Sequence, residues 1–161
     1  MIFVTVGTHE QPFNRLVEYM DNWASEHEEA VVIQTGYSTY EPKSAQWSKL
    51  YSYQKMVELV KEARIVITHG GPSSFLMPLQ INKIPIVVPR QYKYGEHVND
   101  HQLNFVKEVE NRNGTILVVE NVNNLGKLID EYVETRKGEM NISNNANFCC
   151  KFELIVDGMF K

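Results

Sequence analysis

Short apolar runs alternate with longer segments whose apolar residues recur at helical spacing. The short runs have the length of buried strands and lie at 2–6, 30–34, 65–68, 84–88 and 115–119. The longer segments each present one apolar helix face and lie near 13–23, 53–63, 75–81, 103–109 and 122–132. We expect Pro78 to kink or shorten the third of these helices. Residues 37–50 follow neither period and are predicted to be irregular.

This alternation of strands and helices predicts an α/β fold with a parallel sheet covered on both faces. The length of 161 residues suits one domain, and no repeat or low-complexity linker divides the chain. We therefore expect a single domain over residues 1–161, in which the segment 139–161 is a docking tail. Ligands of such sheets bind beyond the carboxyl ends of the strands. The loops of interest are therefore those that start at Gly7, Gly36, His69 and Pro89.

Composition narrows the class of protein. Lys and Arg number 16 against 20 Asp and Glu, and a net charge of −4 disfavours a nucleic-acid partner. The only two cysteines, Cys149 and Cys150, are adjacent, so they cannot form a disulfide framework. The chain starts without a secretory signal, and its longest uncharged stretch, 65–82, contains glycines and prolines that suit a membrane span poorly. These features predict a cytoplasmic protein.

The first candidate site segment is VTVGTHEQPF, at 4–13, where Gly7, Thr8 and His9 form the turn between a strand and a helix. Free backbone amides at a helix N-terminus favour an anion. The alternative is an ordinary turn in which Thr8 caps the helix.

The second segment is THGGPSSF, at 68–75. Two glycines let the backbone approach a ligand, and Ser73 and Ser74 add hydroxyls beside a helix start that Pro72 favours. The spacing matches neither a P-loop nor a dinucleotide-binding motif. A phosphate or diphosphate suits this turn, and a capped helix start without a ligand is the alternative.

The third segment, which follows Pro89, concentrates polar side chains between 96 and 102. His97 and His101 are four residues apart, as zinc ligands on a helix can be. Val98 stands where the metalloprotease motif has Glu, so we expect no metal here and favour a hydroxyl-rich ligand. Arg90 and Lys93 could hold a phosphate, or belong to a solvated basic loop.

Four segments in this order resemble the C-terminal domain of family 28 glycosyltransferases over roughly residues 2–135. They are VTVGTHEQPFNRL at 4–16, THGGPSSF at 68–75, KIPIVVPRQ at 83–91 and EHVNDHQ at 96–102. Within the family, the chain is most similar to the small subunits of bacterial two-chain galactosyltransferases of capsular and exopolysaccharide synthesis. The resemblance implies a Rossmann-like single half, of the C-terminal type, of an inverting enzyme with the GT-B fold.

The resemblance also implies roles for individual residues. It places the donor nucleotide sugar against Gly7, Thr8, His69, Gly70, Gly71, Ser73, Ser74, His101 and Gln102. The leaving diphosphate and the acceptor would meet Arg90, Lys93, Glu96 and His97. His9 and Glu10 are the candidates for a general base in this chain, unless a partner supplies it. Two residues depart from the family pattern: Met77 replaces a Glu that holds the ribose hydroxyls, and Ser73 replaces a Gly.

Since a GT-B enzyme has two such halves, the resemblance implies a membrane-anchored partner subunit. The donor would be a UDP-sugar, with galactose as the expected sugar, and the acceptor an undecaprenyl-diphosphate-linked saccharide. No cofactor is implied, and the chain would lie at the inner face of the membrane through its partner. One alternative is a non-catalytic nucleotide-sugar-binding or enhancer subunit, which Met77 favours. A nucleotide-sugar epimerase of the same architecture is disfavoured, because such enzymes carry both domains in one chain.

Overall fold

Six strands form one parallel sheet in the computed structural model, which describes residues 1–132. The spatial order is β3-β2-β1-β4-β5-β6, and every adjacent pair is parallel. The strands are β1 (Ile2–Thr5), β2 (Val31–Gln34), β3 (Gln46–Ser48), β4 (Ile65–His69), β5 (Ile86–Val88) and β6 (Leu117–Val118). The predicted α/β class is confirmed, and the docking tail predicted at 139–161 lies outside the described residues.

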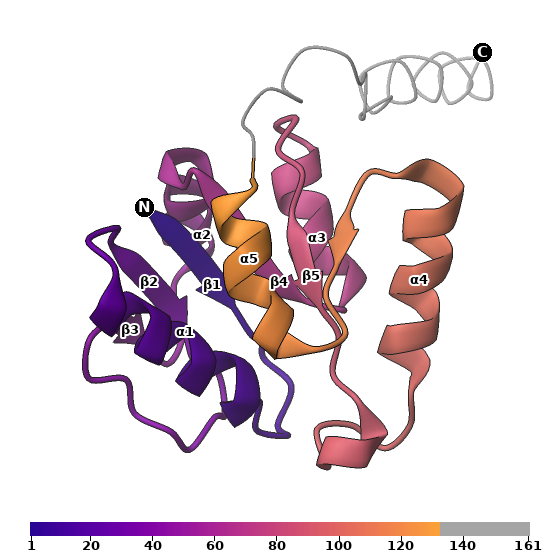
Figure 1. Ribbon diagram of the computed structural model, residues 1–161, viewed down its shortest axis with the longest axis horizontal. Coiled ribbons are helices and arrows are strands. Elements are labelled where there is room, and N and C mark those ends of the chain that lie inside the picture. The colour runs from indigo at the N-terminus through magenta and orange to yellow at the C-terminus, as the bar shows by residue number, and fades with distance from the viewer. Residues whose placement is uncertain (133–161) are drawn as a thin grey trace, which may run out of the picture.

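Helices cover both faces of the sheet (Figure 1). They are α1 (Asn14–Glu26), α2 (Tyr53–Glu62), α3 (Pro72–Leu79), α4 (His101–Asn113) and α5 (Leu125–Asp130), with short 3₁₀ turns η1 (Tyr92–Tyr94) and η2 (Val122–Asn124). Buried side chains of α1 and α5 share one apolar cluster, while α2 packs on the other face and α3 and α4 pack together near β5. None of the helices within residues 1–132 combines the length and the hydrophobicity that a membrane-spanning helix needs.

Strand β1 shows why the apolar runs are continuous rather than alternating. Ile2 and Val4 pack against α1, and Phe3 between them packs against α2. All three are fully buried, since both faces of a parallel sheet are covered.

The structure differs most from the sequence prediction in three elements. The segment 37–50 contains the edge strand β3, whose Gln46 and Trp47 are exposed and therefore gave no apolar signal. Helix α3 begins at Pro72, because proline suits the first helical turn, and it ends at Leu79. Helix α4 begins at His101, so the third segment of the sequence supplies the first turn of a helix.

The long connection between β2 and β3 is held by one buried carboxylate, Asp21 of α1. Its oxygens accept hydrogen bonds from the Tyr40 hydroxyl and from the backbone N–H groups of Lys43, Ser44 and Ala45. Burial would raise the pKa of Asp21, but these hydrogen bonds outweigh burial and lower it. The ionised form is therefore part of the native state.

We predict that Asp21→Asn lowers the free energy of unfolding at pH 7 by about 2–4 kcal/mol, since an amide cannot accept all four bonds. A lowered carboxyl pKa stabilises the native state above the unfolded value, near 3.9, and this contribution is lost as pH falls through the folded pKa. The difference in free energy of unfolding between variant and wild type, measured in urea, should therefore become smaller at acidic pH. A difference that is constant with pH would contradict the prediction.

Candidate functional site

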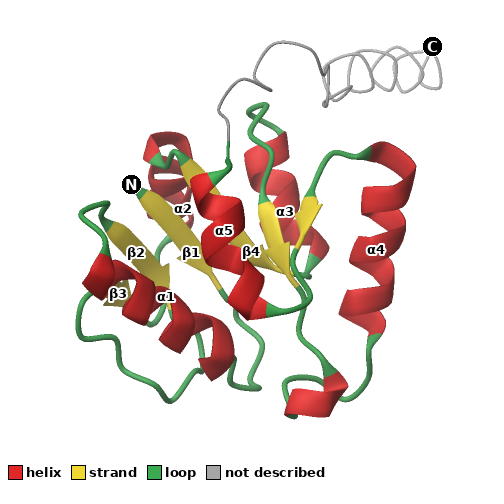
Figure 2. Cartoon of the chain, viewed as in Figure 1, coloured by secondary structure: helices red, strands yellow, loops and turns green. Residues whose placement is uncertain are grey.

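The turns after β1, β4 and β5 come together at the carboxyl edge of the sheet, in the lower part of Figure 2. The side chain that joins them is His69, at the end of β4, which is 8% exposed. It contacts Gly7 of the first turn and Gly71 of its own turn. The candidate segments found in the sequence are thus neighbours in space.

The hydrogen bonds of His69 define its protonation. Its Nδ1 lies 3.1 Å from the N–H of Gly71, which can only donate, so Nδ1 accepts and carries no proton. Burial, followed by the charge of Arg90, lowers the pKa of His69 to about 4. The ring is therefore neutral at pH 7, with its proton on Nε2. That proton is donated to the Ser74 hydroxyl oxygen, 2.9 Å away.

This bond orients the hydroxyl of Ser74. Because its oxygen accepts from His69, the hydroxyl proton is available for another acceptor. Ser74 is partly exposed and lies in the first turn of α3, beside the exposed Ser73. The amide dipoles of a helix N-terminus favour negative charge. The turn is therefore suited to donate hydrogen bonds to an anion such as a phosphate.

Two glycines allow the ring of His69 to occupy this position. A Cβ added to Gly7 would lie 2.3 Å from Nε2 of His69, and one added to Gly71 would lie 2.2 Å from Cε1. Gly7 also has a φ of +75°, which side chains rarely adopt. Glycine is thus required at both positions for the imidazole to fit between the two turns.

Two further histidines lie beside this cluster. The rings of His9 and His97 are 5.4 Å apart, and both are near enough for their charge to lower the pKa of His69. Thr8, His9 and Glu10 are exposed, whereas His97 is partly buried. Among residues 1–132, no group of three or more His, Cys, Asp and Glu side chains is arranged to hold a metal ion.

The two residues of the His-Gln pair have different surroundings. Gln102 reaches into the cluster, where its Oε1 accepts from the N–H of Arg90 at 3.3 Å and its Cβ packs against Gly70. His101 is exposed at the start of α4, and its N–H donates to Asn99. The structure therefore brings Gln102, but not the side chain of His101, into contact with the other turns.

Arg90 differs from both expectations for it, the phosphate ligand and the solvated basic loop. Its side chain is fully buried, and its terminal nitrogens donate to backbone carbonyls of the first and third turns. A guanidinium engaged in this way does not face a diphosphate, because desolvated donors must be satisfied inside the protein. Lys93, by contrast, is exposed, with its Nζ 4.8 Å from the centre of the Tyr94 ring.

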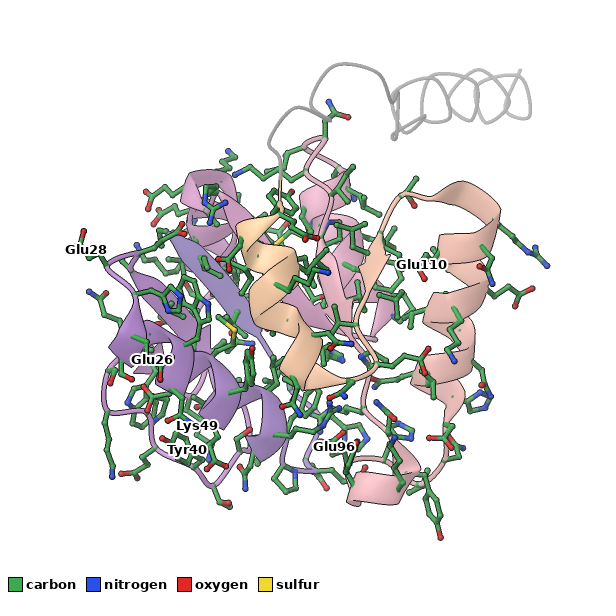
Figure 3. All side chains as sticks on the ribbon, in the orientation of Figure 1. Glu26, Glu28, Tyr40, Lys49, Glu96 and Glu110 are labelled. Atoms are coloured by element: carbon green, nitrogen blue, oxygen red, sulfur yellow. The ribbon has the colours of Figure 1, made fainter. Side chains whose placement is uncertain are left out.

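Glu96 is also an internal residue and not an exposed ligand group. It is 4% exposed and, near the lower edge of Figure 3, forms an ion pair with Arg15 of α1 at 2.8 Å. Arg15 also lies over the rings of Phe13 and Tyr94. Sequence reasoning did not identify Arg15, because an arginine near the start of a helix is usually solvated.

A groove of about 530 Å³ adjoins this ion pair, outside the histidine cluster. Its walls come from α1, from the turn around η1 and from η2, and its lining residues are Pro12, Asn14, Arg15, Glu18, Tyr19, Asn22, Tyr94, Gly95, Glu96 and Val122.

The model of the glycosyltransferase family 28 C-terminal domain matches residues 1–154. The chain belongs to this family. Among curated proteins none matches the chain.

Two solved structures have a similar fold, a glycotransferase of kitacinnamycin and the glycosyltransferase SnogD from Streptomyces nogalater. The match to the first has 14% sequence identity and a TM-score of 0.57. It covers 84% of this chain and 37% of the matched chain. The match to the second has 16% sequence identity and a TM-score of 0.50. It covers 86% of this chain and 39% of the matched chain. This family 28 domain thus has a Rossmann-like fold that matches the C-terminal half of a GT-B protein, and it spans about two fifths of either structure.

The residue that departs from the family pattern, Met77, has a packing role. It lies on the side of α3 that faces α2, partly buried against the cluster that includes Phe3 and Leu59. A thioether in this position contributes apolar contact and cannot accept hydrogen bonds from a ribose as a carboxylate does.

We predict that the family 28 domain loses stability between pH 6.5 and 4 because of His69. A histidine whose folded pKa is lowered stays neutral while the unfolded chain takes up a proton, so stability is complete above about pH 6.5 and falls until the folded pKa, about 4, is reached. The loss attributable to this group is at most about 3 kcal/mol. Urea unfolding of wild type and His69→Gln at pH 7.5 and 4.5 measures it. Parallel losses in both proteins would show that another group is responsible.

Proposed function

We propose that the chain is the donor-binding half of a two-part glycosyltransferase. The observation that carries the proposal is the neutral ring of His69, which lies between the first turn and its own turn and leaves the hydroxyl of Ser74 free to donate. Family membership supports sugar transfer. The resemblance of the four motifs to small subunits of two-chain enzymes supports a second half on another chain.

The donor in this proposal is a UDP-sugar, with galactose as the sugar. Its diphosphate accepts hydrogen bonds from Ser74 and from the first turn of α3, while Gly7 and Gly71 make room for the imidazole that orients Ser74. Its sugar lies toward Gln102, whose amide adjoins Gly70 at the start of the same turn. No cofactor is needed, since the leaving group is already activated as a diphosphate.

The reaction is an inverting displacement at the anomeric carbon. The acceptor hydroxyl oxygen forms the new C–O bond while the bond to the UDP oxygen breaks, and UDP leaves with that electron pair. A general base takes the hydroxyl proton. His9 and Glu10 are exposed beside the partly buried His97, so either can meet an acceptor, unless the partner supplies the base. Lys93, exposed on η1, is the basic group left to offset charge on the leaving diphosphate.

We infer further that the acceptor is an undecaprenyl-diphosphate-linked saccharide of capsular or exopolysaccharide synthesis, and that the partner is a membrane-anchored subunit. This chain would then lie at the inner face of the membrane through its partner. The support is the resemblance of its four motifs to the small subunits of two-chain galactosyltransferases.

A second candidate function is that of a non-catalytic nucleotide-sugar-binding subunit. The specific observation in its favour is Met77, which packs against α2 where many family members hold the ribose with a carboxylate. Weak ribose recognition would suit a subunit that assists an active site formed elsewhere.

We predict that the chain binds UDP more tightly than ADP, and that Ser74→Ala weakens UDP binding by roughly five- to tenfold, the cost of one hydrogen bond to a charged group. Calorimetry measures both. Ser25→Ala is the matched control, because it removes one hydroxyl from the end of α1 that is remote from the three turns. Equal binding of both nucleotides, or an equal effect of both variants, would contradict the assignment.

We predict that a reconstituted complex with a membrane-anchored second half transfers sugar to a lipid-diphosphate-linked acceptor, whereas either chain alone does not. Mass-detected product and released UDP report the reaction. His9→Gln and Glu10→Gln, each made in this chain, test its base candidates. Full activity of the isolated chain would refute the two-part enzyme, and unchanged activity of both variants would assign the base to the partner.

A further inference from the structure

Arg90, directly after β5, gathers the backbone of two separate turns around one buried guanidinium. Its Nη1 donates to the carbonyl oxygens of Gln11, Pro12 and Glu96 at 2.7, 3.2 and 3.3 Å, and its Nη2 donates to that of Val6 at 3.0 Å. The side chain is fully buried, so these bonds are made without competition from bulk water.

The bonded carbonyls bracket the candidate site residues. Val6 and Gln11 stand at the two ends of the exposed stretch Thr8–Glu10, so both ends of that stretch are held by the same side chain. Glu96 is followed directly by His97, whose ring lies 5.4 Å from that of His9. The distance between the first turn and the far end of the third turn is thus defined by one side chain at the start of the third turn.

The buried charge of Arg90 is compensated within the same network. Burial lowers its pKa to about 10 and Glu96 raises it, so the side chain is a cation at neutral pH. Its guanidinium lies 4.9 Å from the centre of the Phe13 ring. The carboxylate of Glu96 pairs with Arg15 and also accepts from the N–H of Gln91. The cation is thus held by backbone carbonyls, an aromatic ring and a carboxylate that also pairs with Arg15, while its Nε is buried without a hydrogen-bond partner within residues 1–132.

The main chain of Arg90 extends the network to α4. Its N–H donates to Oε1 of Gln102, the residue assigned above to the donor sugar. Side chain and backbone of one residue therefore contact the first turn, the third turn and the start of α4.

We propose that Arg90 is a positioning residue that fixes the first and third turns relative to one another, and so sets the spacing of His9 and His97 in the donor site without touching the donor. The functional part of this inference rests on the function proposed above. The mechanical part, that the two turns are held as one unit, does not.

Arginine is required because the fork of a guanidinium can donate in several fixed directions at once. A lysine would keep the buried cation near Glu96, but its single ammonium cannot reach carbonyls on both turns with the same geometry. Arg90→Lys therefore separates the positioning role from the charge. Asp21→Asn is the matched control, because it also perturbs a buried charge with four hydrogen bonds, and none of its four hydrogen-bond partners belongs to the three turns.

The first experiment is native-state hydrogen exchange on the unmodified full chain in low concentrations of guanidinium. The hydrogen-bonded amides within residues 7–11 and 96–98, those of Gly7, Gln11 and Glu96, should open together, with one opening free energy and one denaturant dependence, because one side chain holds both turns. Two independent openings would overturn the proposal, and this measurement does not depend on any variant folding.

The second experiment compares Arg90→Lys with Asp21→Asn. Arg90→Lys should raise exchange of residues 7–11 and 96–98 by roughly tenfold or more while β1 and β4 stay protected, and Asp21→Asn should affect residues 38–45 instead. In the reconstituted enzyme, Arg90→Lys should raise the donor KM by roughly tenfold, and Asp21→Asn should leave it within about twofold. Uniform loss of protection, or freed turns with an unchanged donor KM, would overturn the positioning role. If the enzyme shows no transfer at all, the proposed function fails, and the exchange data still decide whether Arg90 joins the turns.

Discussion

The register between the central strands β1 and β4 is the constraint on which the edge of the sheet depends. Thr5 pairs with Thr68, so Val6 and Gly7 leave the sheet beside His69, whose ring contacts Gly7. The carboxyl ends of parallel strands lie at the same edge of the sheet. A shift of one residue would carry the imidazole away from the space between the glycines and move the side chains of one strand to the opposite, differently packed face of the sheet. The apolar core and the candidate site are therefore fixed by the same pairing.

The sequence predicted those parts of the molecule that depend on local patterns. The apolar runs located five of six strands, and the glycine-rich turns located the candidate site, because burial and backbone conformation restrict the residues allowed there. Strand β3 was missed because Gln46 and Trp47 are exposed at a sheet edge, where pairing is decided by the neighbouring strand and not by an apolar pattern.

Arg90 and Glu96 could not be placed from sequence for a different reason. A charged residue in a loop after a strand is ordinarily solvated, and whether it is buried depends on partners distant in the chain. The carbonyl of Val6 that Arg90 binds is 84 positions away, and Arg15, the partner of Glu96, is 81 positions away. Only the folded topology brings these groups together. The sequence therefore shows that these side chains are charged. It does not show that they point into the protein and not toward a ligand.

Two of the buried polar side chains at this edge, Arg90 and His69, act on one another. Arg90 is a cation beside the imidazole of His69, and after burial it is the largest influence that lowers the pKa of that ring. A neutral His69 can accept from Gly71 at one nitrogen and donate to Ser74 at the other, which a doubly protonated ring could not do. The guanidinium thus contributes to the turn after β4 without a hydrogen bond to it. A positive charge that is screened from the ligand by protein can still favour an anion at the edge of the sheet, because electrostatic interactions decline slowly in a buried environment. In the function proposed above, an anion at this edge would meet oriented amides and one oriented hydroxyl, with the fixed internal charge of Arg90 behind them.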